Sequence, residues 1–175
     1  MTNQGRRLIL MRHAKAEAFA VDDHARTLTE RGRRDAVEAG LWLSANDLVP
    51  DHAVVSSAAR TVGTWDSLDH GLRSTAEVRY EDALYSAGPA TALDVVRTVP
   101  VDARIVVVIG HNPTVAYLAH TLDDGEPDED AFREMSEGYP TAALTVLEVP
   151  VQWADLAEGN AHIAAFHVGH GASAV

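Results

Sequence analysis

The chain has 175 residues and contains no cysteine. This absence excludes disulfide bonds, thiolate metal ligands and thiol nucleophiles, and it is compatible with a reducing cytoplasm. Long apolar runs are also missing. The run at 8–11 is too short for the core of a signal peptide, and no stretch reaches membrane-spanning length. We therefore expect a soluble, cytoplasmic protein with no membrane partner.

Lysine is almost missing too. Of the 14 basic residues, Lys15 is the one lysine, so any clamp for a phosphate group has to be built from arginine. The formal net charge of −12 disfavours binding to nucleic acid or to an anionic membrane surface, because like charges repel. An anionic substrate is compatible with this charge if cationic side chains gather at one place.

Apolar residues make up 46% of the chain, which is typical of a globular protein, and the length fits a single domain covering residues 1–175. Short apolar segments alternate with segments of helical periodicity, which predicts the α/β class. The expected architecture is a three-layer α/β/α sandwich around a mostly parallel sheet with an antiparallel edge. We expect strands at 7–12, 53–56, 77–80 and 104–109, helices at 30–46, 58–68, 89–99 and 114–122, a solvated acidic loop at 123–130, and antiparallel edge strands at 142–149 and 162–168.

Polar side chains follow three of the expected strands. Arg12 and His13 come at the end of the first strand, and His111 and Asn112 follow the strand at 104–109. Arg60 lies one helical turn after the strand at 53–56. Because parallel strands of an open α/β sheet end at the edge where ligands bind, two guanidiniums and two imidazoles would converge there.

This set of side chains suits a phosphoryl group. Two arginine forks can bind its three non-bridging oxygens, and the helices expected after Ser57 and Pro113 direct positive dipole ends to the same edge. A neutral imidazole is a nucleophile toward phosphorus, and nearby cations lower its pKa and keep it unprotonated. This chemistry requires no metal or other cofactor.

Each of these residues alone also has a structural explanation. Arg12 and His13 could be a surface pair, Arg60 a solvated side chain, and His111 a turn residue that caps a helix. The occurrence of such residues at three strand ends favours a common site.

Four segments together resemble the signatures of the histidine phosphatase (phosphoglycerate mutase-like) superfamily. They are R-H-A-K at 12–15, D-H-A-R-T-L-T-E-R-G at 23–32, S-S-A-A-R-T at 56–61 and G-H-N-P at 110–113. Their order and spacing agree with the family over residues 7–122. The short chain, R-H-A-K and G-H-N-P resemble in particular the small phosphohistidine phosphatases of the SixA-like branch.

The resemblance implies a phosphoglycerate mutase-like fold and a hydrolase that works without a cofactor through a phosphohistidine intermediate on His13. Arg12 and Arg60 would bind the phosphate oxygens, His111 would be the fourth member of the pocket, and Asn112 would add a further phosphate contact. Water would then hydrolyse the intermediate in a second in-line step.

The chain departs from the family's pattern at two places. Ser57 stands where the family often has proline, which removes no donor from the site. Many members have a carboxylate general acid after the third strand, where this chain has Glu81 and Asp82. We favour Glu81, with loop carboxylates of no catalytic role as the alternative.

A weak general acid has a consequence for the substrate. Imidazole, whose conjugate acid has a pKa of about 6.5, leaves without strong acid catalysis, whereas an alkoxide does not. We therefore expect phosphohistidine or another phosphate with a good leaving group, carried by a phosphorylated small molecule or a phosphoprotein.

Two other functions fit the same residues. One is a mutase or a sugar or metabolite phosphomonoesterase of the same fold, and the other is a non-catalytic phosphate-binding module. A mutase needs added lid segments that exclude water, and the chain has no insertion long enough. We expect no metal site, because His167 and His170 lack an evident third ligand and segment 123–130 lacks the residue order of a calcium loop. The sequence does not define the oligomeric state.

Overall fold

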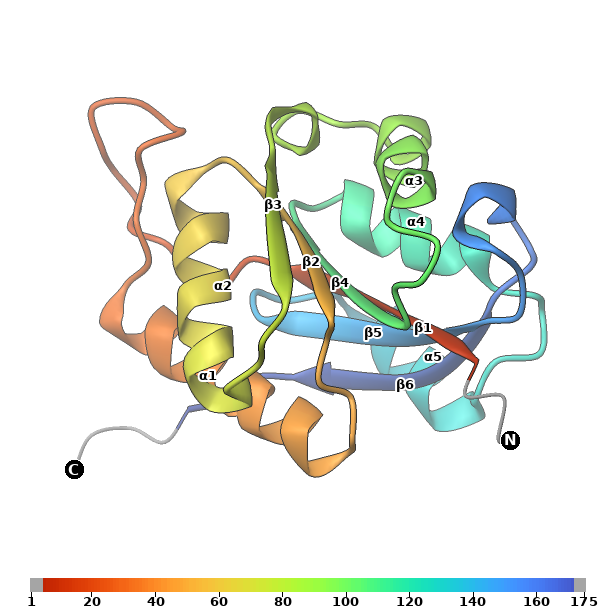
Figure 1. Cartoon of the computed structure of the whole chain (residues 1–175). Coiled ribbons are helices and arrows are strands. Elements are labelled where there is room, and N and C mark those ends of the chain that lie inside the picture. Colours follow the sequence, from red (N-terminus) through yellow and green to blue (C-terminus); the bar gives the residue numbers. More distant parts are fainter. Residues whose placement is uncertain (1–4, 172–175) are drawn as a thin grey trace.

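The computed structural model describes residues 5–171. Its centre is a six-stranded sheet with helices on both faces (Figure 1). The strands are β1 (Arg6–Arg12), β2 (His52–Ser56), β3 (Glu77–Glu81), β4 (Ile105–Gly110), β5 (Ala143–Val149) and β6 (His162–Val168). The helices are α1 (Glu30–Ala45), α2 (Ala59–Leu72), α3 (Pro89–Arg97), α4 (Thr114–Leu122) and α5 (Glu129–Glu137), with short 3₁₀ turns at Asp82–Leu84 and Trp153–Asp155.

The strands lie in the order β3-β2-β4-β1-β5-β6. Strands β1 to β4 pair in parallel, whereas β5 pairs antiparallel with both of its neighbours, β1 and β6. The expected strand at 162–168 is confirmed at the edge, but the expectation that 142–149 is also an edge strand is wrong. Strand β5 is buried at six of its seven residues, which a position inside the sheet requires.

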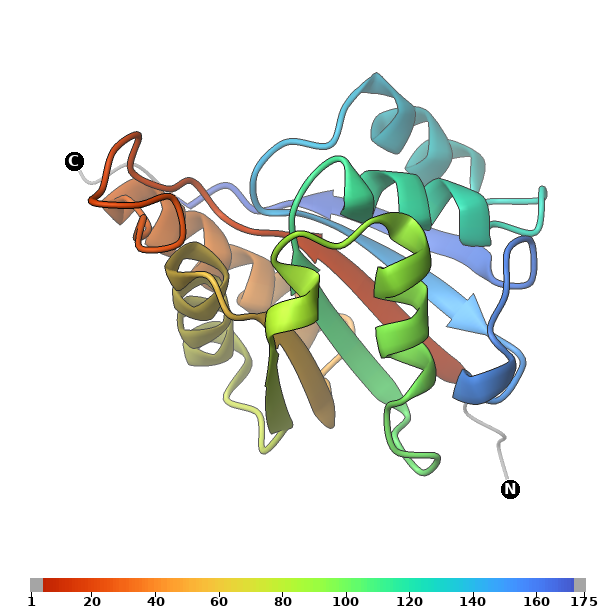
Figure 2. The ribbon, with the colours of Figure 1, turned by 90° about the horizontal axis from the view of Figure 1, so that it is seen from above.

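Side chains of β1 alternate between two hydrophobic cores, because successive residues of a strand point to opposite faces. Leu8 and Leu10 pack with α3, α4 and α5, whereas Ile9 and Met11 pack with α1 and α2. All four side chains are fully buried. The expected three-layer sandwich is therefore confirmed, and Figure 2 shows the sheet between its helical layers.

The helices that follow β1 and β4 leave on opposite sides of the sheet. Helix α1 packs on one face and α4 on the other, although β1 and β4 are adjacent. Such a divergence opens a crevice at the carboxyl ends of the two strands. Arg12 and Gly110 are paired in register at these ends, so the residues that follow them lie at the ligand-binding edge.

Glycines permit α1 to approach its neighbours closely. A Cβ atom on Gly32 would lie 2.1 Å from the carbonyl oxygen of Lys15, and one on Gly40 would lie 2.1 Å from that of Leu68 in α2. The side chain of Thr29 caps α1 by accepting a hydrogen bond from Gly32 N at 3.0 Å, and Thr29 N donates to Lys15 O at 2.9 Å. The segment that follows β1 is thereby fixed against α1.

Two further expectations need correction. Helix α2 continues to Leu72, four residues beyond its expected end at 68. The acidic segment 123–130 is not a loop throughout, because Asp128 accepts a hydrogen bond from Ala131 N at 2.9 Å and caps α5, a helix that the sequence analysis missed. Helix α5 buries only Ala131 and Met135, and this narrow apolar stripe explains why it was missed.

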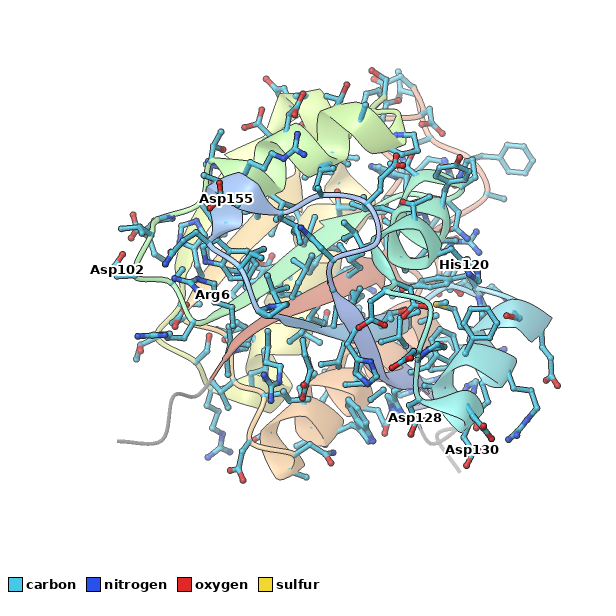
Figure 3. The ribbon with its side chains drawn as sticks, turned by 90° about the vertical axis from the view of Figure 1, so that its right-hand side faces the viewer. Arg6, Asp102, His120, Asp128, Asp130 and Asp155 are labelled. Atoms are coloured by element: carbon cyan, nitrogen blue, oxygen red, sulfur yellow. The ribbon has the colours of Figure 1, made fainter. Side chains whose placement is uncertain are left out.

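Except for the buried Asp35, the acidic side chains of residues 5–171 are exposed or partly exposed. Asp102, Asp128, Asp130 and Asp155 are exposed, and Figure 3 labels them, with Asp128 and Asp130 close together at the beginning of α5. These carboxylates contribute to the negative charge without entering the core. Within residues 5–171, no helix has the length and apolarity needed to cross a membrane.

Candidate active site

The carboxyl ends of β1 and β4 bring two imidazoles together. The backbone N–H of His13 donates to the carbonyl of Gly110 at 3.0 Å, and the ring centroids of His13 and His111 are 5.4 Å apart. Arg60, in the first turn of α2, is buried, and its charge acts on both rings. The structure thus gathers side chains from three strand ends, as the parallel sheet predicts.

His13 is held as a neutral imidazole with one free ring nitrogen. Its Nδ1 lies 2.8 Å from the carbonyl oxygen of Ala14. Because a carbonyl oxygen only accepts hydrogen bonds, Nδ1 carries the proton and Nε2 keeps its lone pair. Burial lowers the pKa of His13 to about 4; the Ala14 bond opposes this effect, and the charges of Arg60 and Arg12 add to it. The ring is therefore neutral, and Nε2 is unprotonated and nucleophilic, at neutral pH.

His111 is positioned from β2. Its Nε2 lies 2.8 Å from Oγ of Ser56, the last residue of that strand. Burial lowers the pKa of His111 to about 4, with smaller contributions from the charges of Arg60 and His13. A phosphoryl group carries negative charge and favours the protonated ring, so its binding opposes this lowering.

Arg12 and Asn112 share one backbone acceptor. Nη1 of Arg12 and Nδ2 of Asn112 each donate to the carbonyl oxygen of Tyr139 at 2.9 Å. Tyr139 is itself anchored, because its hydroxyl donates to Leu10 O at 2.7 Å and lies 2.9 Å from Oγ1 of Thr145. The connection between α5 and β5 therefore sets the direction of the Arg12 guanidinium.

The loop at 17–28 reaches Arg60 through Asp23. Arg60 donates from Nη1 to the carbonyl of Asp23 at 2.8 Å and from Nη2 to its Oδ2 at 3.1 Å. Oδ2 also accepts from the Tyr85 hydroxyl at 2.8 Å, and Oδ1 accepts from Arg26 Nε at 2.9 Å. The bonds from Tyr85 and Arg26 lower the pKa of Asp23 to about 2, so it is ionised at neutral pH. Figure 1 shows this loop projecting at the upper left.

Several buried polar atoms of the site lack a hydrogen-bond partner among residues 5–171. They are Arg12 Nε, Arg60 Nε, His111 Nδ1 and Asn112 Oδ1. A buried polar atom without a partner costs about 1–3 kcal/mol. The two Nε–H groups are donors that the oxygens of a ligand could satisfy, whereas Asn112 Oδ1 is an acceptor and needs a donor. Guanidinium N–H groups match the oxygens of a phosphoryl group in both charge and spacing.

Comparison with known proteins identifies the family. No protein-family model matches the chain. The uncharacterized proteins Rv1276c of Mycobacterium tuberculosis and ML1117 of Mycobacterium leprae are 38% and 34% identical, over 90% of this chain and 99% of each relative. A solved structure from Nakamurella multipartitia, assigned as phosphohistidine phosphatase SixA, is 36% identical, over 97% of this chain and 98% of that one, with a TM-score of 0.84. The chain belongs to the SixA branch of the histidine phosphatase superfamily.

A second SixA structure of the superfamily agrees with this assignment. It comes from Agrobacterium tumefaciens, is 26% identical over 94% of this chain and 98% of that one, and has a TM-score of 0.76. The resemblance that the four sequence segments indicated is thereby confirmed, together with the fold it implied.

The carboxylates expected near the general-acid position of this SixA-like histidine phosphatase make other contacts. Oε1 of Glu81 accepts a hydrogen bond from Ala83 N at 3.2 Å, and Oε2 lies 3.8 Å from Arg79 Nε. Asp82 is an exposed residue at the start of the 3₁₀ turn. Glu81 pairs in register with Ser56, whose Oγ contacts His111, so it lies at the same edge of the sheet. The contacts described for residues 5–171 join neither carboxylate directly to the imidazole pair.

The candidate metal ligands of the histidine phosphatase have structural partners. His167 stacks on Trp42, with ring centroids 4.5 Å apart and 4° between the planes, and its Nε2 lies 2.9 Å from Glu38 Oε2. The same carboxylate oxygen accepts from His170 N at 3.0 Å. In the part of the chain that the structure describes, no three His, Asp or Glu side chains are grouped as a metal ion would require.

Basic residues also line a hollow of about 510 Å³ at the opposite, amino end of β1. There Arg7 pairs with Glu148 at 2.9 Å, and Arg6 donates to the carbonyl of Val151 at 3.2 Å. Among the described residues that line this hollow, His162 is the one histidine, so no pair of imidazoles lies beside these arginines. The carboxyl edge of the sheet is therefore the candidate active site of this histidine phosphatase.

Three residues of the site received no role in the sequence analysis. Asp23 belongs to the D-H-A-R segment, so the motif marked it without showing that it binds Arg60. Tyr85 follows the third strand closely, in a segment where the family pattern indicates a carboxylate and not a tyrosine. Tyr139 has no sequence signal, because its contact with Arg12 spans 127 residues of chain.

Proposed function

We propose that this protein is a phosphatase that transfers the phosphoryl group of its substrate to His13 and then to water. The observation that carries the proposal is the state of the His13 ring: Ala14 O holds its Nδ1 proton, and a pKa of about 4 leaves Nε2 unprotonated. The charges of Arg12 and Arg60, which act on this ring, are the groups that would stabilise a phosphoryl group beside it. The 36% identity to a protein assigned as a phosphohistidine phosphatase supports the same activity.

In the first step, the Nε2 lone pair of His13 attacks phosphorus in line with the leaving group. An Nε2–P bond forms, the bond from phosphorus to the leaving atom breaks, and the electron pair of that bond stays with the leaving atom. Arg12 and Arg60 provide N–H donors and positive charge for the three equatorial oxygens, and His111 adds charge when the bound phosphoryl group favours its protonation. Phosphoryl transfer depends mainly on such placement and charge stabilisation.

In the second step, a water molecule attacks the phosphorus of the intermediate. The Nε2–P bond breaks, its electron pair returns to Nε2, and both protons of the water leave with the product as dihydrogen phosphate. The Nδ1 proton stays on the hydrogen bond to Ala14 throughout. Since a ring protonated at Nδ1 departs as a neutral imidazole, this step needs no separate general acid.

The preferred substrate follows from the contacts of Glu81. Because its carboxylate is bonded to Ala83 N and lies near Arg79, we propose that leaving groups depart without its proton. This favours phosphohistidine, in a phosphoprotein or a small molecule, over alkyl phosphates such as sugar phosphates. Equal turnover of phosphohistidine and a simple alkyl phosphate would contradict this part of the proposal.

We further propose that residues 1–175 form one catalytic domain located in the cytoplasm. Support for the first point is the single sheet that receives strands from both halves of the chain. A sequence without cysteine is compatible with the second point. Cell fractionation tests the location directly.

The activity is tested with a purified sample, an aryl phosphate and EDTA. We expect release of inorganic phosphate and, after rapid quenching in alkali, a phosphorylated peptide that contains His13 and loses its phosphate in acid. His13→Ala should lower turnover by at least about 1,000-fold, as expected for loss of a nucleophile. His120→Ala, which changes an exposed histidine on α4, is the matched control and should have no effect.

Other outcomes would assign a different function. An isomerised phosphoester in place of inorganic phosphate would identify a mutase. Tight binding of phosphate with no turnover of any phosphorylated compound would identify a binding module. Full activity of His13→Ala would remove the nucleophile from the proposal.

A further inference from the structure

Four aromatic rings, which we call the row, neighbour one another in turn from the nucleophile His13 to the exposed His24. The ring centroids of His13 and His111 are 5.4 Å apart, those of His111 and Tyr85 are 5.8 Å apart, and those of Tyr85 and His24 are 4.9 Å apart. The first three rings are partly buried and His24 is exposed. The two outer rings have no part in the displacement steps described above.

The Tyr85 ring is held in place from several sides. Its hydroxyl donates to Oδ2 of Asp23 at 2.8 Å, and its centroid lies 5.8 Å from Cζ of Arg60. The preceding residue, Leu84, is buried in the core beneath α3, which anchors the backbone. A ring fixed in this way can present a defined surface to a ligand at low entropic cost.

His24 is tied to the beginning of α2. Its carbonyl accepts a hydrogen bond from Ala59 N at 2.9 Å, and its Nε2 lies 3.1 Å from Oγ of Ser57. Its ring meets that of Tyr85 at 73°, an edge-to-face arrangement. The outer end of the row is therefore bound to the same helix that carries Arg60.

We propose that Tyr85 and His24 form a subsite for a planar aromatic leaving group, and that Tyr85 is a specificity-determining residue. This inference rests on the proposed function, because it places the leaving group relative to a phosphoryl group held at Arg60. In-line displacement puts the departing atom on the far side of phosphorus from His13. The leaving group therefore lies farther from the nucleophile than the phosphoryl group does. We place it at the outer rings, because the Tyr85 ring lies next to Arg60, which would hold the phosphoryl group.

The chemistry of the rings selects flat, unsaturated groups. Tyr85 already makes edge contacts with His111 at 83° and with His24 at 73°. An imidazole or phenyl ring can make the same kind of contact, which a sugar or an acyl group cannot. Contacts of this kind correspond to a preference of about 3- to 10-fold.

The test compares two substrates with good leaving groups, of which only one has a ring. p-Nitrophenyl phosphate releases an aromatic phenolate, and acetyl phosphate releases a carboxylate. The quantity of interest is the ratio of kcat/KM for the first substrate to that for the second. This ratio cancels any general loss that arises when a change at Tyr85 disturbs Asp23 or Arg60.

We expect Tyr85→Ala to lower this ratio by about 3- to 10-fold, mainly through KM for the aromatic substrate. Tyr85→Phe keeps the ring and loses the hydrogen bond to Asp23, so it should retain the ratio even if both activities fall. Tyr117→Ala, which removes a 58% exposed tyrosine of α4, is the matched control and should change neither activity. An unchanged ratio in Tyr85→Ala, or an equal drop in Tyr85→Phe, would overturn the proposal.

A binding measurement keeps this test independent of turnover. Phenylphosphonate and methylphosphonate contain a P–C bond that the enzyme cannot hydrolyse, and calorimetry gives their affinities directly. Tyr85→Ala should lower the ratio of phenyl to methyl affinity by the same 3- to 10-fold factor. Absence of turnover in the unaltered protein would contradict the phosphatase function alone. The aromatic subsite would be contradicted if the ratio of phenylphosphonate to methylphosphonate affinity were the same in the unaltered protein and in Tyr85→Ala.

Discussion

Asp23 binds Arg60 through two different oxygens, one from its backbone carbonyl and one from its carboxylate. The loop at 17–28 thereby fixes the guanidinium of Arg60, whose charge acts on both imidazoles. The same carboxylate also accepts hydrogen bonds from Tyr85 and Arg26, so one exposed side chain organises three donors around the site. The family motif at 23–32 contains both Asp23 and Thr29, the helix cap of α1. One short segment therefore both positions Arg60 and fixes the beginning of α1.

We predict that Asp23→Ala lowers kcat/KM for an aryl phosphate by about 10-fold, because a misplaced Arg60 no longer stabilises the transition state. Asp23→Asn should lose less, since its amide oxygen can still accept from the guanidinium. Asp22→Ala changes the neighbouring carboxylate, which bonds only Ala25 N in the described contacts, and should leave kcat/KM within twofold. Equal kinetics in Asp22→Ala and Asp23→Ala would contradict a positioning role.

We predict that the rings of His13 and His111 titrate near pH 4, below the ordinary histidine pKa of 6.5, because burial disfavours their charged forms. Arg60→Ala removes a cation that lowers both values, so both pKa values should rise. Histidine ¹⁵N NMR measures these titrations. Arg104→Ala, at the opposite end of the sheet, should shift neither of them.

The same pKa values determine how the free energy of unfolding changes with pH. Since both rings have lower pKa values in the folded state than in the unfolded chain, the unfolded chain binds more protons between about pH 6.5 and pH 4. The contribution of these rings to stability is therefore complete above pH 6.5 and is lost as the pH falls toward 4. Urea unfolding should show this loss, and the loss should shrink in His13→Phe. A pH-independent difference between the two proteins would contradict the linkage.

We predict that Gly32→Ala lowers the free energy of unfolding by about 1–3 kcal/mol, because the new Cβ would overlap the carbonyl of Lys15. Gly63→Ala is the matched control. It also adds a methyl group to a helical glycine, but its nearest neighbour would be Leu28 at 3.4 Å, which is ordinary contact. Gly63→Ala should therefore be neutral or stabilising by up to about 1 kcal/mol. Equal effects of the two substitutions in urea unfolding would contradict a steric cause.

We predict that Glu81→Gln keeps kcat for a phosphate with a good leaving group within twofold. The amide oxygen can still accept from Ala83 N, so the fold is preserved, while any proton donated by this side chain is lost. Asp82→Asn should behave alike. A loss of 10-fold or more in Glu81→Gln, together with a change in the alkaline limb of the pH profile, would restore Glu81 as general acid.

The strands that build the site could be predicted because their residues are covered on both faces. The four β-branched and apolar residues after Ile105 in β4 are buried, and such a run has few alternatives to a central strand. The helix cap at Thr29 could also be predicted, because it depends only on residues that are close in the sequence. The convergence of Arg12, His13 and His111 then followed from parallel pairing.

The parts that could not be predicted depend on contacts between distant segments. Helix α5 is mostly polar, and its role appears only when the following turn brings the carbonyl of Tyr139 to Arg12. The place of β5 inside the sheet depends on β6 covering its free edge, which no local pattern specifies. The contacts of Glu81 with Ala83 and Arg79 likewise depend on the folded arrangement and have no signal in the sequence.

The hydrogen bond between His13 Nδ1 and Ala14 leaves a single ring position open to modification. A covalent adduct on this enzyme should therefore be one regioisomer, τ-phosphohistidine, without its π counterpart. Isomer-selective antibodies would label the trapped protein with one reagent and not the other. The backbone of one small residue thus decides the chemical form in which the phosphate is carried.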